Sequence, residues 1–274
     1  INDTSKIQIK PNVYAWRDIN LANAHLNSYN YQRELDSHLL KNTEWGAVAY
    51  LSHSAYGVST SIRINNHSDN ITGYQANNEP TCSYTGTNEE CNKYCNDNTC
   101  NVAYPNSEKA STTGNNTGFF DTSMRGSMVF GVMANKNGVP LAGSNFITGF
   151  NGEFSHPNIV GMPEYTSGID YPEQKYYDLY IHEETNYNMS FYRRILGDAT
   201  GEMGPLASTS ESIGLRISSW YGDSISQYFS DTYPFAVRGY GADVGYGTLA
   251  GIFSFLGGYG SSNENLSYRI VLTP

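Results

Sequence analysis

Four cysteines, Cys82, Cys91, Cys95 and Cys100, are the residues of this sequence with the most versatile chemistry. They lie in a stretch rich in Asn, Thr and Glu, which has too few apolar residues to hold its shape by burial. Disulfides would close such a loop in an oxidising compartment, and the three possible pairings stay open. Zinc is the alternative, because Cys91 and Cys95 have ligand-like spacing and the other two could complete a four-thiolate set. The composition favours disulfides.

Other catalytic and metal-binding patterns are weak. The histidines show no HExxH spacing and no nucleophile elbow accompanies them; they are His25, His38, His53, His67, His156 and His182. The run ILGDATGEMG places Asp198 and Glu202 where their carboxylates could hold calcium, but it lacks the alternating acids of a dedicated calcium loop. We therefore expect no catalytic residue, no metal and no cofactor, with a structural calcium ion as the open alternative.

Composition and charge narrow the class of protein. Only 15% of the residues are charged, whereas Tyr occurs 23 times and Gly 27 times, so neutral polar groups must wet the surface. This is typical of an extracellular protein or the surface of a particle. The net charge is −10 and the 16 Lys and Arg residues form no run, which excludes a protein that tracks nucleic-acid phosphates.

Hydrophobic patterning gives no run of about 18 apolar residues, so we expect no transmembrane helix. The chain begins at Ile1 without a leader. A membrane connection would therefore need a preceding segment, such as an export signal, a pilin-like stalk or an anchor.

The elements that must position these residues are few and short. Asp36–Tyr50 is the strongest predicted helix; within it, Asn42 or Thr43 could cap a second helix that begins at Glu44, with Trp45 and Val48 facing inward. A weaker helix is predicted around Asp18–Ser28. The predicted strands are short alternating or apolar pieces, namely Ser61–Ile64, Gly118–Phe120, Met128–Met133, Tyr176–Leu179, Ala250–Phe255 and Tyr268–Leu272.

Long stretches without a periodic pattern separate these pieces. Structureless loops of this length are uncommon inside compact domains, so residues 65–116, which carry the cysteines, and residues 136–174 are predicted insertions on a core. No internal repeat, Pro-rich linker or charge block marks a boundary. Residues 1–274 are therefore predicted to form a single domain, in which 235–274 is a candidate variable, ligand-displaying segment.

Four islands of sequence resemble one family. They are KNTEWGAVAYLSHSAYG (41–57), ASTTGNNTGFFDTS (110–123), RRILGDATGEMGP (193–205) with SSWYGD (218–223), and FAVRGYG, AGIFSF and SYRIVL within 235–272. These islands are similar to the C-type-lectin-like domains related to formylglycine-generating and sulfatase-modifying proteins, found on bacterial surface, pilin-like and phage proteins. The resemblance spans residues 11 to 272, with unmatched loops between the islands. It implies an α+β, C-type-lectin-like fold of the formylglycine-generating-enzyme type with long loop insertions.

The sequence departs from the family pattern at informative places. The Gly-Gly-Ala-Trp-Glu signature of the family is replaced by MRGSMVFGVM, residues 124–133, and the familiar Arg-Gly-Gly reads Arg238-Gly239-Tyr240. The enzymes of the family use two cysteines near the C-terminal end to bind copper, and this chain has no cysteine after Cys100. The resemblance thus implies a protein that is not an enzyme, and a formylglycine-generating-like oxidase is the least favoured alternative.

Other members of the family are variable proteins of diversity-generating retroelements, in which mutagenesis at adenines of a C-terminal cassette changes exposed residues while the fold persists. The last forty residues resemble such a cassette: loops of Tyr, Gly, Ser and Asn, which combine contact area with adaptable hydrogen bonding, alternate with framework residues. That framework is Arg238, Gly239, Ala250, Gly251, Phe253, Phe255, Arg269 and Val271. The predicted ligand-binding residues are Tyr240, Asp243, Val244, Tyr246, Leu256, Tyr259, Ser262, Asn263 and Glu264.

Structural roles are the simplest interpretation of the other large side chains. Aromatic residues bury the most surface, so Trp45, Trp220, Phe253, Phe255 and Tyr268 are predicted to fill the core. Arg238 and Arg269 are predicted to anchor loops by donating to backbone carbonyls, because a planar group with five donors suits irregular backbone.

The predicted function is non-catalytic binding, as an adhesin or receptor-binding protein, of a protein or glycan on another cell or particle. The expected location is extracellular, on a bacterial surface or a phage particle. The alternative is a pilus or tail subunit that uses the same face to assemble into a larger surface structure.

Overall fold

The computed structural model describes separate parts of the chain. They are residues 16, 19–59, 62, 111–115, 118–119, 122, 126–134, 137, 172–181, 195–200, 216–217, 223–227, 229, 233–239, 251–260 and 266–273. The four cysteines and most of the predicted loop insertions lie outside the described residues. So do Trp220, Ala250 and Glu202.

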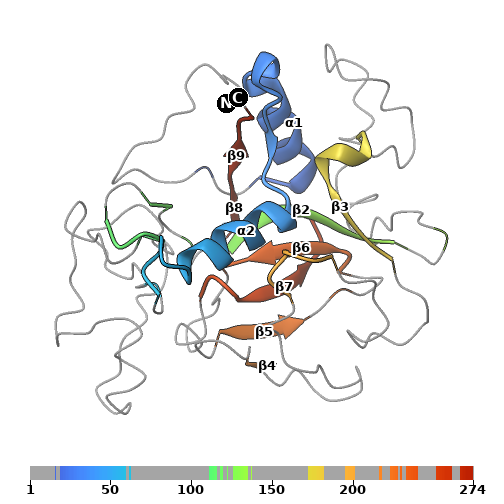
Figure 1. The fold of residues 1–274 in the computed structure, drawn as a ribbon. Coiled ribbons are helices and arrows are strands. Elements are labelled where there is room, and N and C mark those ends of the chain that lie inside the picture. Colours follow the sequence, from blue (N-terminus) through green and yellow to red (C-terminus); the bar gives the residue numbers. More distant parts are fainter. Residues whose placement is uncertain are drawn as a thin grey trace.

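The described elements are helices and a mixed sheet, so the fold is α+β (Figure 1). The α-helices are α1 (Leu21–Tyr31) and α2 (Asn42–Ser52), and two 3-10 turns are η2 (Arg33–Leu35) and η5 (Gln174–Tyr176). The strands are β1 (His38–Leu39), β2 (Gly126–Ala134), β3 (Asp178–Ile181), β4 (Arg216–Ile217), β5 (Ser224–Gln227), β6 (Phe235–Arg238), β7 (Phe255–Gly258), β8 (Leu266–Tyr268) and β9 (Ile270–Val271).

The main sheet has the strand order β3-β2-β6-β7-β5-β4, and β8 pairs with β2 off this path. Antiparallel pairing joins β2 to β6, β6 to β7 and β4 to β5, whereas β3 and β8 run parallel to β2 and β5 runs parallel to β7. A separate two-stranded sheet pairs β1 with β9. The C-terminal strands therefore close against both the start and the middle of the chain.

The two helices cover opposite faces of the main sheet. Met128, Phe130 and Val132 of β2 belong to the cluster that includes the buried side chains of α1, whereas Val129 belongs to the cluster that includes Trp45 of α2. Successive side chains of a strand point to opposite faces, so this division places one helix on each side. Figure 1 shows α2 crossing the sheet beside β2 and β6. The centre of the sheet is thus covered on both faces, which explains the continuous apolar sequence of β2.

The predicted helix over Asp36–Tyr50 is wrong in its first part. Asp36 adopts a left-handed conformation with φ 46°, and His38 and Leu39 pair with β9. The alternative, a helix that begins near Glu44, is close to the structure, since α2 runs over Asn42–Ser52. Trp45 is fully buried and Val48 packs on the same cluster, as predicted.

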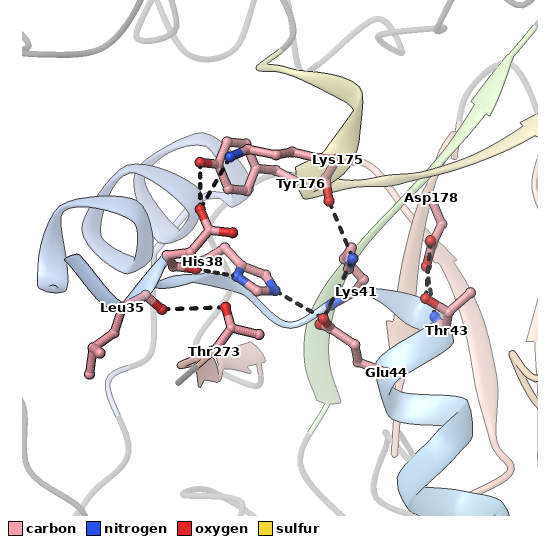
Figure 2. A network of polar contacts seen from close by, with 10 residues as sticks. Leu35, His38, Lys41, Thr43, Glu44, Lys175, Tyr176, Asp178 and Thr273 are labelled. Carbon is pink, nitrogen blue, oxygen red and sulfur yellow. Dashed lines mark hydrogen bonds and ion pairs between the residues drawn. The ribbon is translucent and has the colours of Figure 1, made fainter. Parts of the chain in front are cut away.

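The N-terminus of α2 is capped by carboxylates rather than by its own first residue. Lys41 occupies the N-cap position, and its ammonium side chain can only donate hydrogen bonds, so it cannot cap the helix N–H groups. The Glu44 carboxylate instead accepts from the Lys41 backbone N–H at 2.8 Å. Asp178 of β3 accepts from the backbone N–H of Thr43 at 2.7 Å and from its hydroxyl at 3.1 Å (Figure 2). These carboxylates lie where the helix dipole favours negative charge.

We expect the change Asp178→Ala to lower the free energy of unfolding by about 1–2 kcal/mol, because it removes a helix cap provided by another element. Thr43→Ala, which keeps the backbone N–H bond to Asp178, should cost less than half as much. Urea unfolding followed by circular dichroism measures both. Equal losses for the two variants would show that the bond to the Thr43 backbone contributes little.

The other predicted elements match unevenly. Asp18–Ser28 is confirmed as a helix but begins later, because the Asn20 side chain accepts from the Asn23 N–H at 2.7 Å and caps α1. Met128–Met133 lies within β2. Tyr176–Leu179 overlaps β3, although Tyr176 belongs to η5. Tyr268–Leu272 is divided between β8 and β9.

The remaining predicted strands fail or cannot be compared. Ala250–Phe255 is wrong in place, since Gly251–Phe253 form a turn and Phe255 begins β7; Gly118 and Phe119 lie outside any strand. Only Ile62 of Ser61–Ile64 is among the described residues. The central strand β6 had no sequence prediction, because FAVR is too short to show a period.

Candidate functional site at the base of the β6–β7 loop

The predicted ligand-binding residues divide between described and undescribed parts of the chain. Tyr240, Asp243, Val244, Tyr246, Ser262, Asn263 and Glu264 lie outside the described residues, whereas Leu256 and Tyr259 lie within them. What the structure does describe is the framework from which the predicted loops leave. Residues 239–254 join β6 to β7, and Arg238 pairs with Phe255 at the foot of this connection, called here the β6–β7 loop.

Arg238 is the side chain at the centre of this base. Its guanidinium, which is fully buried on the α2 face of the sheet, donates from Nη1 to the Asp198 carbonyl and to Asn42 Oδ1, each at 3.2 Å. Nη2 donates to the Ile252 carbonyl at 3.5 Å, across the foot of the loop. The prediction that Arg238 anchors a loop by donating to carbonyls is therefore confirmed.

A chain of buried polar groups continues from Arg238. Asn42 Nδ2 donates to Tyr180 Oη at 2.5 Å, and that hydroxyl donates to Asp198 Oδ2 at 2.7 Å. The other oxygen of Asp198 accepts from the backbone N–H and the hydroxyl of Thr200, at 2.9 and 2.7 Å. A buried charge is tolerable only when it is hydrogen-bonded, and this chain links the buried cation to a buried carboxylate through two neutral groups.

The part of the loop that returns to β7 has further hydrogen bonds, from Trp45 and to Asp223. Trp45 Nε1 donates to the Ile252 carbonyl at 2.7 Å, and the Phe253 backbone N–H donates to Asp223 Oδ2 at 2.8 Å. Gly251 lies so close to Asp223 that a Cβ there would come within 2.0 Å of the carboxylate. On the outgoing side, Gly239 follows Arg238 with φ 74°, a conformation that favours glycine.

The second predicted segment, around Tyr259, leaves from a different place. The ribbon of β6 and β7 is antiparallel, with Phe235 opposite Gly258, so residues 259–265 depart from the end remote from Arg238. The two bases are separated by the length of a four-residue strand, about 10 Å. The segments that follow Arg238 and Gly258 therefore leave the β6–β7 pair at opposite ends.

Both described members of the predicted ligand face have partners within the protein. Leu256 packs against the α1-side cluster. Tyr259 Oη donates to Tyr233 Oη at 2.6 Å, and their rings lie 4.2 Å apart. Sequence reasoning missed Tyr233. Whether Leu256 and Tyr259 also contact a ligand stays a prediction.

The predicted calcium alternative can be compared with the structure only in part. In the part of the chain that the structure describes, no three His, Cys, Asp or Glu side chains form a group able to hold a metal ion. Both Asp198 oxygens already accept hydrogen bonds from the protein. Glu202, its predicted partner for calcium, and the four cysteines lie outside the described residues.

Sequence reasoning did not assign four residues to the base of the loop that the structure places in its hydrogen-bond network. They are Asn42, Tyr180, Asp198 and Asp223. Each is buried and has at least one hydrogen-bond partner far along the chain. A signal existed for the two aspartates, because ILGDATG and SSWYGD both contain Gly-Asp within the family-like islands. Their carboxylates satisfy backbone or hydroxyl donors.

Comparison with known proteins does not identify a relative. No family model matches the chain, and no curated protein matches it either. Neither α-helix in the described part of the chain has the length and hydrophobicity to span a bilayer.

Proposed function

We propose that this protein is a non-catalytic binding protein that presents the β6–β7 loop to a protein or glycan on another cell or particle. The observation that carries the proposal is the clamped base, where Arg238, Trp45 and Asp223 hold Ile252 and Phe253 by hydrogen bonds to the backbone. A base held in this way lets the loop change its sequence without disturbing the sheet, which is how antibody loops vary on a rigid framework.

The sequence of the loop supports this role. Residues 240–250 contain Tyr240 and Tyr246 among glycines, with Asp243 as a directional polar group. Tyrosine gives a large amphipathic contact with few torsions to restrict, and such residues dominate binding energy at interfaces. We further propose that the fold is C-type-lectin-like, that the C-terminal segment is a variable cassette of a diversity-generating retroelement, and that the protein acts at a bacterial surface or on a phage particle.

The proposal gives the tyrosines different roles, and this difference can be tested. Tyr240 and Tyr246 would contact the ligand, whereas Tyr259 packs within the protein. We expect the double variant Tyr240→Ala, Tyr246→Ala to lose at least tenfold in binding to cells or to an immobilised glycan array, with the free energy of unfolding changed by less than about 0.5 kcal/mol. Tyr259→Ala should instead cost about 1 kcal/mol of stability, because Tyr259 packs and hydrogen-bonds with Tyr233.

Binding is measured by flow cytometry with labelled protein over a panel of bacterial strains, and stability by urea unfolding. Undiminished binding by the double variant would contradict the assignment of the loop. If the unchanged protein sediments as an oligomer and the double variant binds normally but sediments as a monomer, the assembly role is supported instead. Sequencing of the encoding genome adds an independent arm: a reverse transcriptase beside a near-copy of the last codons, differing only at adenines, is expected.

A further inference from the structure

A second buried polar side chain lies on the other face of the sheet. His25 of α1 is fully buried, and its imidazole is enclosed by the rings of Phe130 at 5.1 Å, Tyr29 at 6.0 Å and Tyr176 at 6.0 Å. These rings come from β2, from α1 itself and from η5. The imidazole therefore lies where α1 meets both the sheet and the turn that leads into β3.

The imidazole has no hydrogen-bond partner at either nitrogen within the described part of the chain. Buried polar groups are nearly always paired, so an unpaired ring among aromatic side chains requires an explanation. In its neutral form it behaves as a small aromatic group. In its protonated form it would be a buried cation without an anion, which is far more costly.

Among the described residues, the side chains in ring contact with His25 are aromatic and include no carboxylate. From α1 the titratable neighbour is Tyr29, from η5 it is Tyr176, and from β1 it is His38, whose ring lies 6.0 Å from that of Tyr176. From β2 the neighbour is the apolar Phe130.

Asp36 and Glu44 are the acids that contact Tyr176 and His38. Asp36 accepts from the Tyr176 hydroxyl at 2.9 Å and pairs with Lys175 at 3.3 Å. The Glu44 carboxylate lies 2.9 Å from His38 Nε2 (Figure 2). A proton on His25 would therefore meet aromatic rings and a second, readily protonated histidine.

We propose that His25 makes the packing of α1 on the sheet an acid-sensitive lock, which is closed while the imidazole is neutral and opens when it is protonated. Opening would uncover the cluster that α1 shares with Phe235 and Val237 of β6. The lock would thus act on the same strand that carries Arg238, although the proposal does not depend on the function of the loop.

The sign of the pH dependence follows from the two histidines. Burial, and then repulsion by His38, lowers the pKa of His25 from 6.5 to about 3. Between pH 6.5 and pH 3, His25 is therefore protonated in the unfolded chain but neutral in the folded chain. The contribution of His25 to the free energy of unfolding is complete above pH 6.5 and is lost as the pH falls from 6.5 towards 3.

His38 has the opposite effect. Burial lowers the pKa of His38, but hydrogen bonds to Glu44 and to the Asp36 carbonyl, together with the Glu44 charge, outweigh burial and raise it above 6.5. The stability from His38 is present below pH 6.5 and is lost as the pH rises through its folded pKa.

The variant His25→Phe removes the proton-binding group but keeps a ring in the aromatic enclosure. We expect the ratio of the wild-type unfolding constant to that of the variant to rise about 100-fold between pH 7.5 and pH 4.5, since one proton taken up gives tenfold per pH unit. Urea unfolding at a series of pH values measures this ratio. A ratio that stays within twofold would overturn the proposal.

The matched control is His38→Gln, which leaves His25 in place. This variant should be most destabilised at acid pH and approach the wild type as the pH rises, which is the opposite trend. A flat or similar trend in both variants would mean that the acid effect is not specific to His25.

Two measurements on the unchanged protein keep the proposal testable if the variants fold poorly. The NMR signals of the His25 ring should not titrate near pH 6.5 in the folded state, and a native transition there would overturn the lock. Hydrogen exchange, corrected for intrinsic rates, should show α1 losing protection before β2 at pH 5. Simultaneous loss in both elements would also contradict it.

Discussion

Arg238→Ala is expected to lower the free energy of unfolding by about 3–5 kcal/mol, because it removes a large buried side chain and its hydrogen bonds to three acceptors, of which the Ile252 carbonyl keeps the bond from Trp45 Nε1. Those acceptors are the carbonyls of Asp198 and Ile252 and the side chain of Asn42. Two of them belong to connections rather than to strands, so both the turn at 195–200 and the foot of the β6–β7 loop lose their common anchor.

A pair of control variants separates charge from geometry. Arg238→Lys keeps the cation, but a point-like ammonium cannot reach the three acceptors together, so we expect a loss of about 2 kcal/mol. Arg269→Ala serves as the comparison arginine: its guanidinium lies 4.4 Å from the ring centre of Phe119 in a half-buried position, so we expect a smaller loss than for the fully buried Arg238. Urea unfolding measures all three. If Arg238→Ala costs no more than Arg269→Ala, Arg238 is not the anchor of the loop.

Gly46→Ala should destabilise the protein by at least about 3 kcal/mol, although alanine normally favours a helix over glycine by about 1 kcal/mol. A Cβ at residue 46 would lie 2.0 Å from the Gly197 carbonyl oxygen and 2.5 Å from the Asp198 Cα. These are backbone atoms, which cannot rotate away as a side chain could. Either α2 must lift from the turn or the turn must leave the Arg238 network.

The neighbouring residue gives the control for this prediction. Ala47 is exposed on the same helix, so Ala47→Gly should show only the propensity cost of about 1 kcal/mol. Thermal and urea unfolding of the two variants give the comparison. Stabilisation by Gly46→Ala would show that the close approach of α2 to residues 197–198 is incorrect. Increased proteolysis within 195–200 is the expected local sign of the clash.

The variants of Arg238 and Gly46 test one arrangement from two sides. Arg238 approaches the turn at 195–200 from β6, and Gly46 approaches it from α2. Because they share the backbone of Asp198, their effects should not add. A double variant that costs clearly less than the sum would confirm that the helix, the turn and the loop base form one unit.

Local sequence was sufficient for the elements whose pattern is complete within themselves. The short apolar run MVFGVM predicted β2, and Trp45 and Val48 predicted the buried face of α2. Arg238 was predicted as an anchor from its chemistry alone, since a side chain with five donors among glycines must find acceptors. Most of the loop that it supports remains a prediction from composition.

Other features depended on contacts that no local pattern records. The left-handed Asp36 and the pairing of His38 with Val271 interrupt a stretch that reads as helix. β6 is too short to show a period, and it is a strand because β2 and β7 flank it. Tertiary structure overrides weak local preference in such places.

The sequence by itself determined an α+β chain with little charge, a Tyr- and Gly-rich C-terminal segment and a framework arginine within it. Only the tertiary structure decided that Asn42, Tyr180 and Asp198 join Arg238, and that the His25 imidazole is enclosed by aromatic rings. The physical reason is the same in both cases. Burial makes an unpaired polar group costly, and which groups become buried together depends on how distant segments pack.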